Sequence, residues 1–149
     1  MAVWIDWLLD TTAASSSFSG EHGYHYYFRC RSHDNAGNIE EWPANPDYDT
    51  STTVDAHPPS TTVEPLPAYT YQSSFTVHWN GSDDLSGLAQ YNLYYRDEAA
   101  ADWTFWLASP PWQTSASFIG VAGHTYHFCS RGLDNAGNVE AWLGSSVDW

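Results

Sequence analysis

The chain of 149 residues is strongly acidic: 18 Asp and Glu stand against four Lys and Arg, and the formal net charge is −14. Such a charge repels phosphate backbones and anionic lipids, so neither nucleic acid nor a membrane surface is an expected partner. No apolar run is long enough to predict membrane insertion, and residues 1–6 lack the basic start and long apolar core of a signal peptide. If the parent protein is secreted, its export signal is expected upstream of this chain.

Large aromatic residues dominate the composition, with nine Trp, ten Tyr and six Phe. They supply enough apolar mass for a core, and aromatic residues favour strands. No long stretch shows the i, i+3, i+4 spacing of an amphipathic helix. Composition and patterning therefore predict an all-β protein.

A long internal repeat organises the chain. Residues 34–40 read Asp-Asn-Ala-Gly-Asn-Ile-Glu, and residues 134–140, one hundred positions later, read Asp-Asn-Ala-Gly-Asn-Val-Glu. Pairs in the same register are Phe18/Phe118, Gly20/Gly120, Gly23/Gly123, Tyr26/Tyr126, Phe28/Phe128, Arg31/Arg131 and Trp42/Trp142, while Trp4-x-x-Trp7 matches Trp103-x-x-Trp106 one residue out of phase. A repeat of about one hundred residues is the size of one β-sandwich domain. Function is therefore expected from an array of modules rather than from a catalytic pocket.

The predicted elements of the first repeat begin with a strand at Trp4-x-x-Trp7 and continue with a strand around Tyr26 and Phe28. Residues 50–55, Thr-Ser-Thr-Thr-Val-Asp, form a further β-prone stretch. Pro58-Pro59 marks the start of the second repeat, because consecutive prolines end a preceding element.

Six strands with alternating apolar residues are predicted in the second repeat. They span Thr61–Leu66, Ser74–Trp79, Leu88–Arg96, Trp103–Leu107, Ser115–Ile119 and His124–Leu133. Residues 80–87 form a turn-rich loop between the second and third strands. This loop contains Asn80-Gly81-Ser82, an accessible glycosylation sequon if the host glycosylates secreted proteins.

Strand alternation also assigns the buried positions. The residues predicted to be buried are Trp79, Tyr91, Leu93, Tyr126 and Phe128, with Phe18, Tyr26 and Phe28 as their counterparts in the first repeat. Cys30 shares the inward alternation and is predicted to be a small core residue. Cys129 lies one position out of register and is predicted to face solvent, so the two cysteines are not expected to pair.

The second repeat carries a pattern that resembles a known class of modules. It reads Phe75-x-Val77-x-Trp79-x-Gly81-x-Asp83-x-x-Ser86-Gly87-x-x-x-Tyr91, followed by Trp103, Tyr126-x-Phe128 and Asp134-Asn135-Ala136-Gly137-Asn138. This pattern resembles bacterial extracellular fibronectin type III-like and immunoglobulin-like repeats, and it covers nearly the whole second repeat and the latter half of the first. The resemblance implies a tandem Ig/fibronectin type III-like β-sandwich with Trp79 in its core. It also implies that Tyr26 and Tyr126 are tyrosine corners, whose hydroxyls bond to nearby backbone.

The two repeats are expected to differ in their strand content. Residues 1–57 have no counterpart of Thr61 to Arg96, so they are assigned to a partial β-sandwich repeat with only its latter strands and a linker. By the family pattern, residues 50–55 are the closing strand of that sandwich. Residues 58–149 are assigned to a β-sandwich repeat that lacks its last strand.

The acidic loops of the second repeat form the sharpest candidate site. The resemblance implies that the loop after the second strand and the loop after the sixth lie at the same pole. Calcium takes six to eight oxygens from carboxylates, amides and carbonyls. The candidate metal ligands are Asp83, Asp84, Asp134, Asn135, Asn138 and Glu140. The same residue types also make tight turns without a metal, and the spacing is not that of an EF-hand, so calcium and a structural turn are alternatives.

Sugar binding and catalysis have weaker support. Tyr69, Tyr71, Trp112 and Trp149 lie in expected loops or edges, where they could stack on a polysaccharide or pack at a repeat interface. The chain contains no nucleophile elbow, zinc-protease motif, phosphate loop or Cys-x-x-Cys. The seven histidines are interpreted as scattered surface residues. The chain is therefore not expected to be an enzyme.

These features predict a non-catalytic structural or adhesive repeat that is extracellular or on the cell surface. A half sandwich would expose its aromatic residues and its strand edges. The missing strands are expected from other copies of the chain, which would give a filament, or from adjacent repeats of a longer stalk. The alternative is a calcium- or carbohydrate-binding accessory module of a secreted enzyme.

Overall fold

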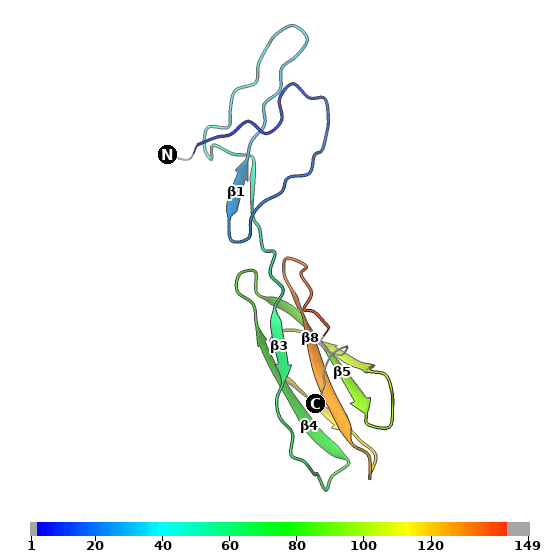
Figure 1. Cartoon of the computed structure of the whole chain (residues 1–149). Coiled ribbons are helices and arrows are strands. Elements are labelled where there is room, and N and C mark those ends of the chain that lie inside the picture. Colours follow the sequence, from blue (N-terminus) through cyan, green and yellow to red (C-terminus); the bar gives the residue numbers. More distant parts are fainter. Residues whose placement is uncertain (1–2, 143–149) are drawn as a thin grey trace.

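The computed structural model describes residues 3–142, and every helix or strand in that range is a β-strand. Eight strands form three antiparallel sheets, which are arranged in two units along an elongated molecule (Figure 1). Residues 3–57 are called the N-terminal unit below, and residues 58–142 the C-terminal unit. The described residues contain no helix that is long and apolar enough to cross a membrane. The predicted all-β class is confirmed.

Two three-stranded antiparallel sheets build the C-terminal unit, in the orders β3-β4-β7 and β6-β5-β8. Their strands are β3 (Ser60–Val63), β4 (Ser74–Ser82), β5 (Leu88–Asp97), β6 (Thr104–Ser109), β7 (Ser115–Ile119) and β8 (Tyr126–Asp134). All six predicted strands are present, with ends shifted by a few residues. β4 extends through residues 80–82 because these residues pair with residues 60–62 of β3. The Asn80 sequon therefore lies within a strand and not in the predicted turn.

The two sheets face each other across an aromatic core. The buried residues are Val77 and Trp79 of β4, Tyr91 and Leu93 of β5, and Phe118 of β7. Trp79 packs edge-on against Tyr91 and Trp106, with ring centroids 6.5 and 6.2 Å apart. Burying one large apolar side chain contributes about 1.5–3 kcal/mol, so this cluster holds the sheets together. Burial is confirmed for Trp79, Tyr91 and Leu93, whereas Tyr126 and Phe128 are half-buried at the margin of the cluster.

In each unit, a half-buried tyrosine near the start of the equivalent strand forms a hydrogen bond to the backbone of the preceding loop. The Tyr126 hydroxyl accepts a hydrogen bond from the backbone N–H of Val121 (3.0 Å), and the Tyr26 hydroxyl accepts one from Glu21 (2.9 Å). A Cβ atom at Gly120 would lie 2.8 Å from Cε2 of Tyr126, so the chain reaches the ring only because residue 120 is glycine. The predicted bonds from these two hydroxyls to nearby backbone are confirmed.

The N-terminal unit contains one two-stranded sheet, in which β1 (His25–Phe28) pairs with β2 (Thr50–Thr53). β2 lies inside the stretch 50–55 that was expected to close the sandwich. The strand predicted at Trp4-x-x-Trp7 is absent. The ring of Trp4 instead packs against the guanidinium group of Arg29, whose Cζ lies 3.9 Å from the ring centroid. In the second repeat, the counterpart of this segment is Trp103-x-x-Trp106, which overlaps β6. The backbone of β6 is hydrogen-bonded to β5. Residues 3–57 contain no equivalent of β5, so the segment has nothing to pair with.

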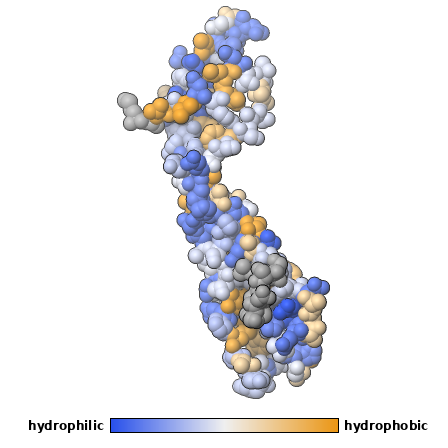
Figure 2. Space-filling model, viewed as in Figure 1, coloured by the Kyte–Doolittle hydropathy of each residue, from blue (hydrophilic) through white to orange (hydrophobic). Residues whose placement is uncertain are grey.

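The aromatic residues of the N-terminal unit are largely uncovered. Phe18 is 41% exposed, whereas its repeat counterpart Phe118 is 6% exposed. Figure 2 shows apolar side chains gathered at the surface of this unit. The prediction that Phe18 is buried is wrong, and Tyr26 and Phe28 are only half-buried, because no second sheet of residues 3–57 packs against them.

The prediction for Cys30 is wrong, whereas Cys129 lies on the outer face of its strand, as predicted, but is half-buried there. Cys30 is exposed because it lies beyond the end of β1 in a unit without a covering sheet. Cys129 is half-buried on β8, opposite Tyr94 of β5. Burial raises the pKa of the Cys129 thiol to about 11. Aromatic packing covers this outer face of the sheet, since Tyr94 and Trp103 both contact Trp142.

Candidate cation site at the junction of the two units

The repeated Asp-Asn-Ala-Gly-Asn segments fold as tight turns that their first and last residues close. Asn138 donates from its backbone N–H to Oδ1 of Asp134 (2.7 Å) and from Nδ2 to Oδ2 (2.8 Å). Asn38 makes the same two bonds to Asp34, at 2.9 and 2.6 Å. The glycine of each turn has a positive φ, 98° at Gly137 and 89° at Gly37, which favours glycine. Turn closure therefore accounts for the residue types of the motif in both units.

The β4–β5 loop lies beside the turn that follows β8, as the resemblance implied. Asn135 joins them, because its Nδ2 donates to the carbonyl oxygens of Ser86 (2.9 Å) and Gly87 (3.0 Å). Asp83 closes its own loop by accepting the N–H groups of Leu85 (3.1 Å) and Gly87 (2.7 Å) on Oδ2. The predicted pole of the C-terminal unit thus exists, and the N-terminal unit joins it through the linker (Figure 1).

Asp55 of the linker brings a third carboxylate to this pole. Its side chain is only 3% exposed, and its Oδ2 accepts the N–H of Ser86 (2.9 Å) while its carbonyl oxygen accepts Nδ2 of Asn138 (3.0 Å). Ser86, whose side chain and backbone N–H both face this carboxylate, holds the pKa of Asp55 below its usual range. Carboxylate oxygens of Asp55, Asp83 and Asp134 all lie within 4.8 Å of one another. This group offers oxygen ligands alone, and the buried Oδ1 of Asp83 has no hydrogen-bond partner among the described residues.

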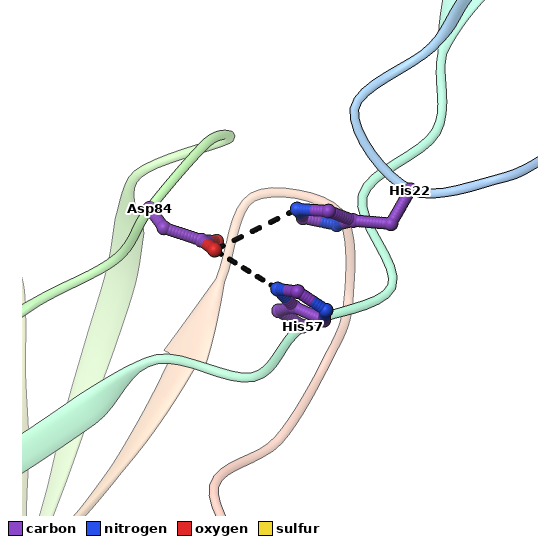
Figure 3. A group of neighbouring side chains, drawn as sticks. All are labelled: His22, His57 and Asp84. Atoms are coloured by element: carbon purple, nitrogen blue, oxygen red, sulfur yellow. Dashed lines mark hydrogen bonds and ion pairs between the residues drawn. The ribbon is translucent and has the colours of Figure 1, made fainter.

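Asp84 belongs to a second group, in which its carboxylate points toward two histidines (Figure 3). Its Oδ2 lies 2.9 Å from Nδ1 of His57 and 3.6 Å from Nε2 of His22. The two imidazole rings stack, with centroids 3.6 Å apart and planes inclined by 20°. One ligand atom from each residue lies within 4.8 Å of the other two. This second group combines two imidazole nitrogens with one carboxylate and is partly open to solvent.

Glu140 belongs to neither group. Its Oε1 accepts the N–H of Thr61 (2.9 Å), and its Oε2 accepts the N–H of Gly132 (2.9 Å). Glu140 therefore ties β3 to β8 at the side of the C-terminal unit. It lies there because the chain returns beside β8 after the turn, where Val139 bridges to Leu133. The structure thus brings Asp83 and Asp134 together with Asn138 beside them, places Asp84 in a separate group, and leaves Glu140 outside both.

Three residues at the junction were missed by the sequence analysis: His22, Asp55 and His57. The histidines had been interpreted as scattered, yet these two touch although they are far apart in the chain. The one signal in the sequence is a departure from the repeat, because the counterpart of His22 is Ala122. The linker residues have no counterpart in the described second repeat, so the repeat offers no comparison for them.

The exposed aromatic residues proposed for sugar binding do not share a surface. Tyr69 and Tyr71 are 94% and 96% exposed and precede β4, whose start pairs with the end of β7. Trp112 is 81% exposed and precedes the start of β7. They therefore lie toward opposite ends of the β4–β7 pair. Trp149 lies outside the described residues.

Comparison with known proteins identifies no relative. No family model matches the chain, and no curated protein or solved structure is significantly similar to it.

Proposed function

We propose that this chain is a non-catalytic structural or adhesive repeat of an extracellular or cell-surface protein, of the fibronectin type III-like or immunoglobulin-like type. In this proposal, strands equivalent to β3–β5 complete the N-terminal unit. They come either from another copy, which builds a filament, or from an adjacent repeat of a longer stalk. The observation that carries the proposal is the exposure of Phe18 compared with the burial of Phe118.

The N-terminal unit contains half of a sandwich core with the geometry of the complete one. Trp7 and Phe18 lie 5.4 Å apart between ring centroids, as do their counterparts Trp106 and Phe118. The Phe18–Phe28 distance of 5.0 Å likewise matches the 4.9 Å between Phe118 and Phe128. In the C-terminal unit, Phe75 of β4 and Tyr95 of β5 cover the remaining side of Phe118, at 5.6 and 5.0 Å. The N-terminal core requires residues that would cover Phe18 in the same way.

One edge of β1 is also open among the described residues. The carbonyl oxygens of Tyr24 and Phe28 accept bonds from the chain that contains β2, so the backbone groups of His25 and Tyr27 point to the opposite edge. In the C-terminal unit the equivalent edge of β8 pairs with β5, and Thr125, the counterpart of His25, accepts the N–H of Glu98. An incoming strand with the pattern of β5 would pair with β1 in the same way.

The test supplies the proposed strands. A second copy of residues 58–102 is joined directly ahead of Trp4, which reproduces the order and the phase of the internal repeat. We expect the extended chain to show a second cooperative melting transition, a blue shift of tryptophan emission and slower hydrogen exchange at His25 and Tyr27. The matched control carries Trp79→Asp and Leu93→Asp in the added copy alone and should show none of these changes.

Sedimentation velocity separates the two sources of the strands. If they come from other copies, the unextended chain associates with rising concentration and the extended chain stays monomeric. If they come from an adjacent repeat of the same polypeptide, both chains are monomeric and only the extended one shows the new transition. An added segment that stays unfolded, or a control that behaves like the extended chain, contradicts the proposal.

A further inference from the structure

We propose that His22, His57 and Asp84 bind a zinc-like divalent transition-metal ion, which fixes the N-terminal unit against the C-terminal unit. The three side chains come from the loop before β1, from the linker and from the β4–β5 loop (Figure 3). An ion held by all three would therefore join both units and the connection between them. The site does not depend on strand addition, because none of its residues lies on the open edge of β1.

The Asp84 oxygen lies near each histidine nitrogen at a separation close to that between two ligands of one metal ion. Oδ2 of Asp84 is 3.6 Å from Nε2 of His22 and 2.9 Å from Nδ1 of His57. Tetrahedral zinc with bonds of about 2.1 Å places its ligand atoms about 3.4 Å apart. Both separations lie within about half an ångström of that value.

The imidazole rings must turn to share an ion, because the nitrogen lone pairs of stacked rings lie in two nearly parallel planes that are 3.6 Å apart between ring centroids. The site permits this rotation. The His57 and Asp84 side chains are 58% and 55% exposed, so both can take new rotamers without disturbing the core. His22 is less exposed, at 25%, and it acts as the fixed ligand toward which the other two move.

Asp55 is placed to support His22 as a ligand. In the metal-free protein, Nδ1 of His22 accepts the N–H of Ala56 (3.1 Å), which leaves the ring proton on Nε2. When Nε2 binds the ion, that proton moves to Nδ1, where Oδ1 of Asp55 lies 3.3 Å away and accepts it. Ala56 is exposed, so its N–H can bond to water instead. A carboxylate behind a metal-bound histidine fixes the tautomer and strengthens the ligand.

The donor set selects the class of ion. Two imidazole nitrogens and one carboxylate oxygen suit zinc, cobalt, nickel and copper, with solvent in the remaining position. Calcium requires six to eight oxygens and gains little from imidazole.

The experiment titrates zinc chloride, and separately calcium chloride, into the full chain by calorimetry in a non-coordinating buffer. All proteins carry Cys30→Ser, because the exposed thiol would bind zinc by itself. We expect one zinc per chain and no calcium response. His57→Gln is the decisive variant because its side chain is exposed, and we expect it to weaken zinc binding by about 100-fold or more. Asp55→Asn should weaken binding by about 10–100-fold, as loss of a supporting carboxylate does.

Two variants serve as matched controls. His124→Gln removes a histidine that contacts a single carboxylate, Asp97, and Asp83→Asn removes a member of the oxygen-only group. Neither should change zinc affinity. NMR of the imidazole nitrogens should show His22 changing from the Nε2–H to the Nδ1–H tautomer as zinc is added. The proposal is overturned if millimolar zinc does not bind, if His57→Gln binds zinc as tightly as its parent, or if calcium binds and Asp83→Asn abolishes that binding.

Discussion

Replacing Trp79 by alanine tests whether the packing between β4 and β5 holds the C-terminal unit together. Trp79 is 1% exposed and contacts the rings of Tyr91 and Trp106. Truncating a buried tryptophan costs about 3–5 kcal/mol. The indole Nε1–H donates to the carbonyl oxygen of Gln113 (3.0 Å), but this oxygen also accepts the Ser109 hydroxyl (2.6 Å), so no buried acceptor is left unpaired. We therefore expect no further penalty from polar atoms.

The expected loss is large compared with the total stability of about 5–15 kcal/mol for a small domain. The midpoint of thermal unfolding should fall by about 12 °C or more, as followed by near-UV and far-UV circular dichroism. Trp112→Ala is the matched control, because that side chain is 81% exposed and its loss should change stability by less than about 0.5 kcal/mol. If both variants unfold at the same temperature, Trp79 is not part of the structural core and the packing argument fails.

Two further predictions concern thiol reactivity and acid. Iodoacetamide should modify the exposed Cys30 much faster than Cys129, whose thiol pKa burial raises to about 11; equal rates by mass spectrometry would refute the packing over β8. Hydrogen bonds from the side chain and backbone of Asn38 hold the pKa of Asp34 below its usual range. The stability that these bonds give the turn is therefore present above the ordinary Asp pKa, and it is lost as the pH falls through the lowered pKa. An NMR titration should show the Asn38 amide shifting in that acidic range, and Asp34→Asn should abolish the shift.

Local chemistry made much of this protein predictable. Alternating apolar residues identified β4 and β5 and their inward side chains Trp79, Tyr91 and Leu93. The Asp-Asn-Ala-Gly-Asn segment identified both turns, because its bonds and its positive-φ glycine involve only residues close in the chain. The resemblance implied the tyrosine hydroxyl bonds, which reach only five residues back.

Features that depend on distant segments were not predictable in this way. The segment at Trp4-x-x-Trp7 has the residues of a strand, but a strand needs a neighbour, and residues 3–57 contain none for it. The exposure of Cys30 and the partial burial of Cys129 were missed for a related reason. Alternation assigns a side chain to one face of a strand, and only tertiary packing determines whether that face is covered.

The sequence by itself determined the β class, the repeat, its turns and the apolar faces of β4, β5 and β8, because these follow from contacts within a strand or a turn. Only the tertiary structure decided that His22, His57 and Asp84 meet at one point and that Asp55 joins Asp83 and Asp134. These residues come from separate loops and a linker, and their side chains follow no periodic pattern. The route of the linker between the two units brings them together, and that route is a property of the folded chain.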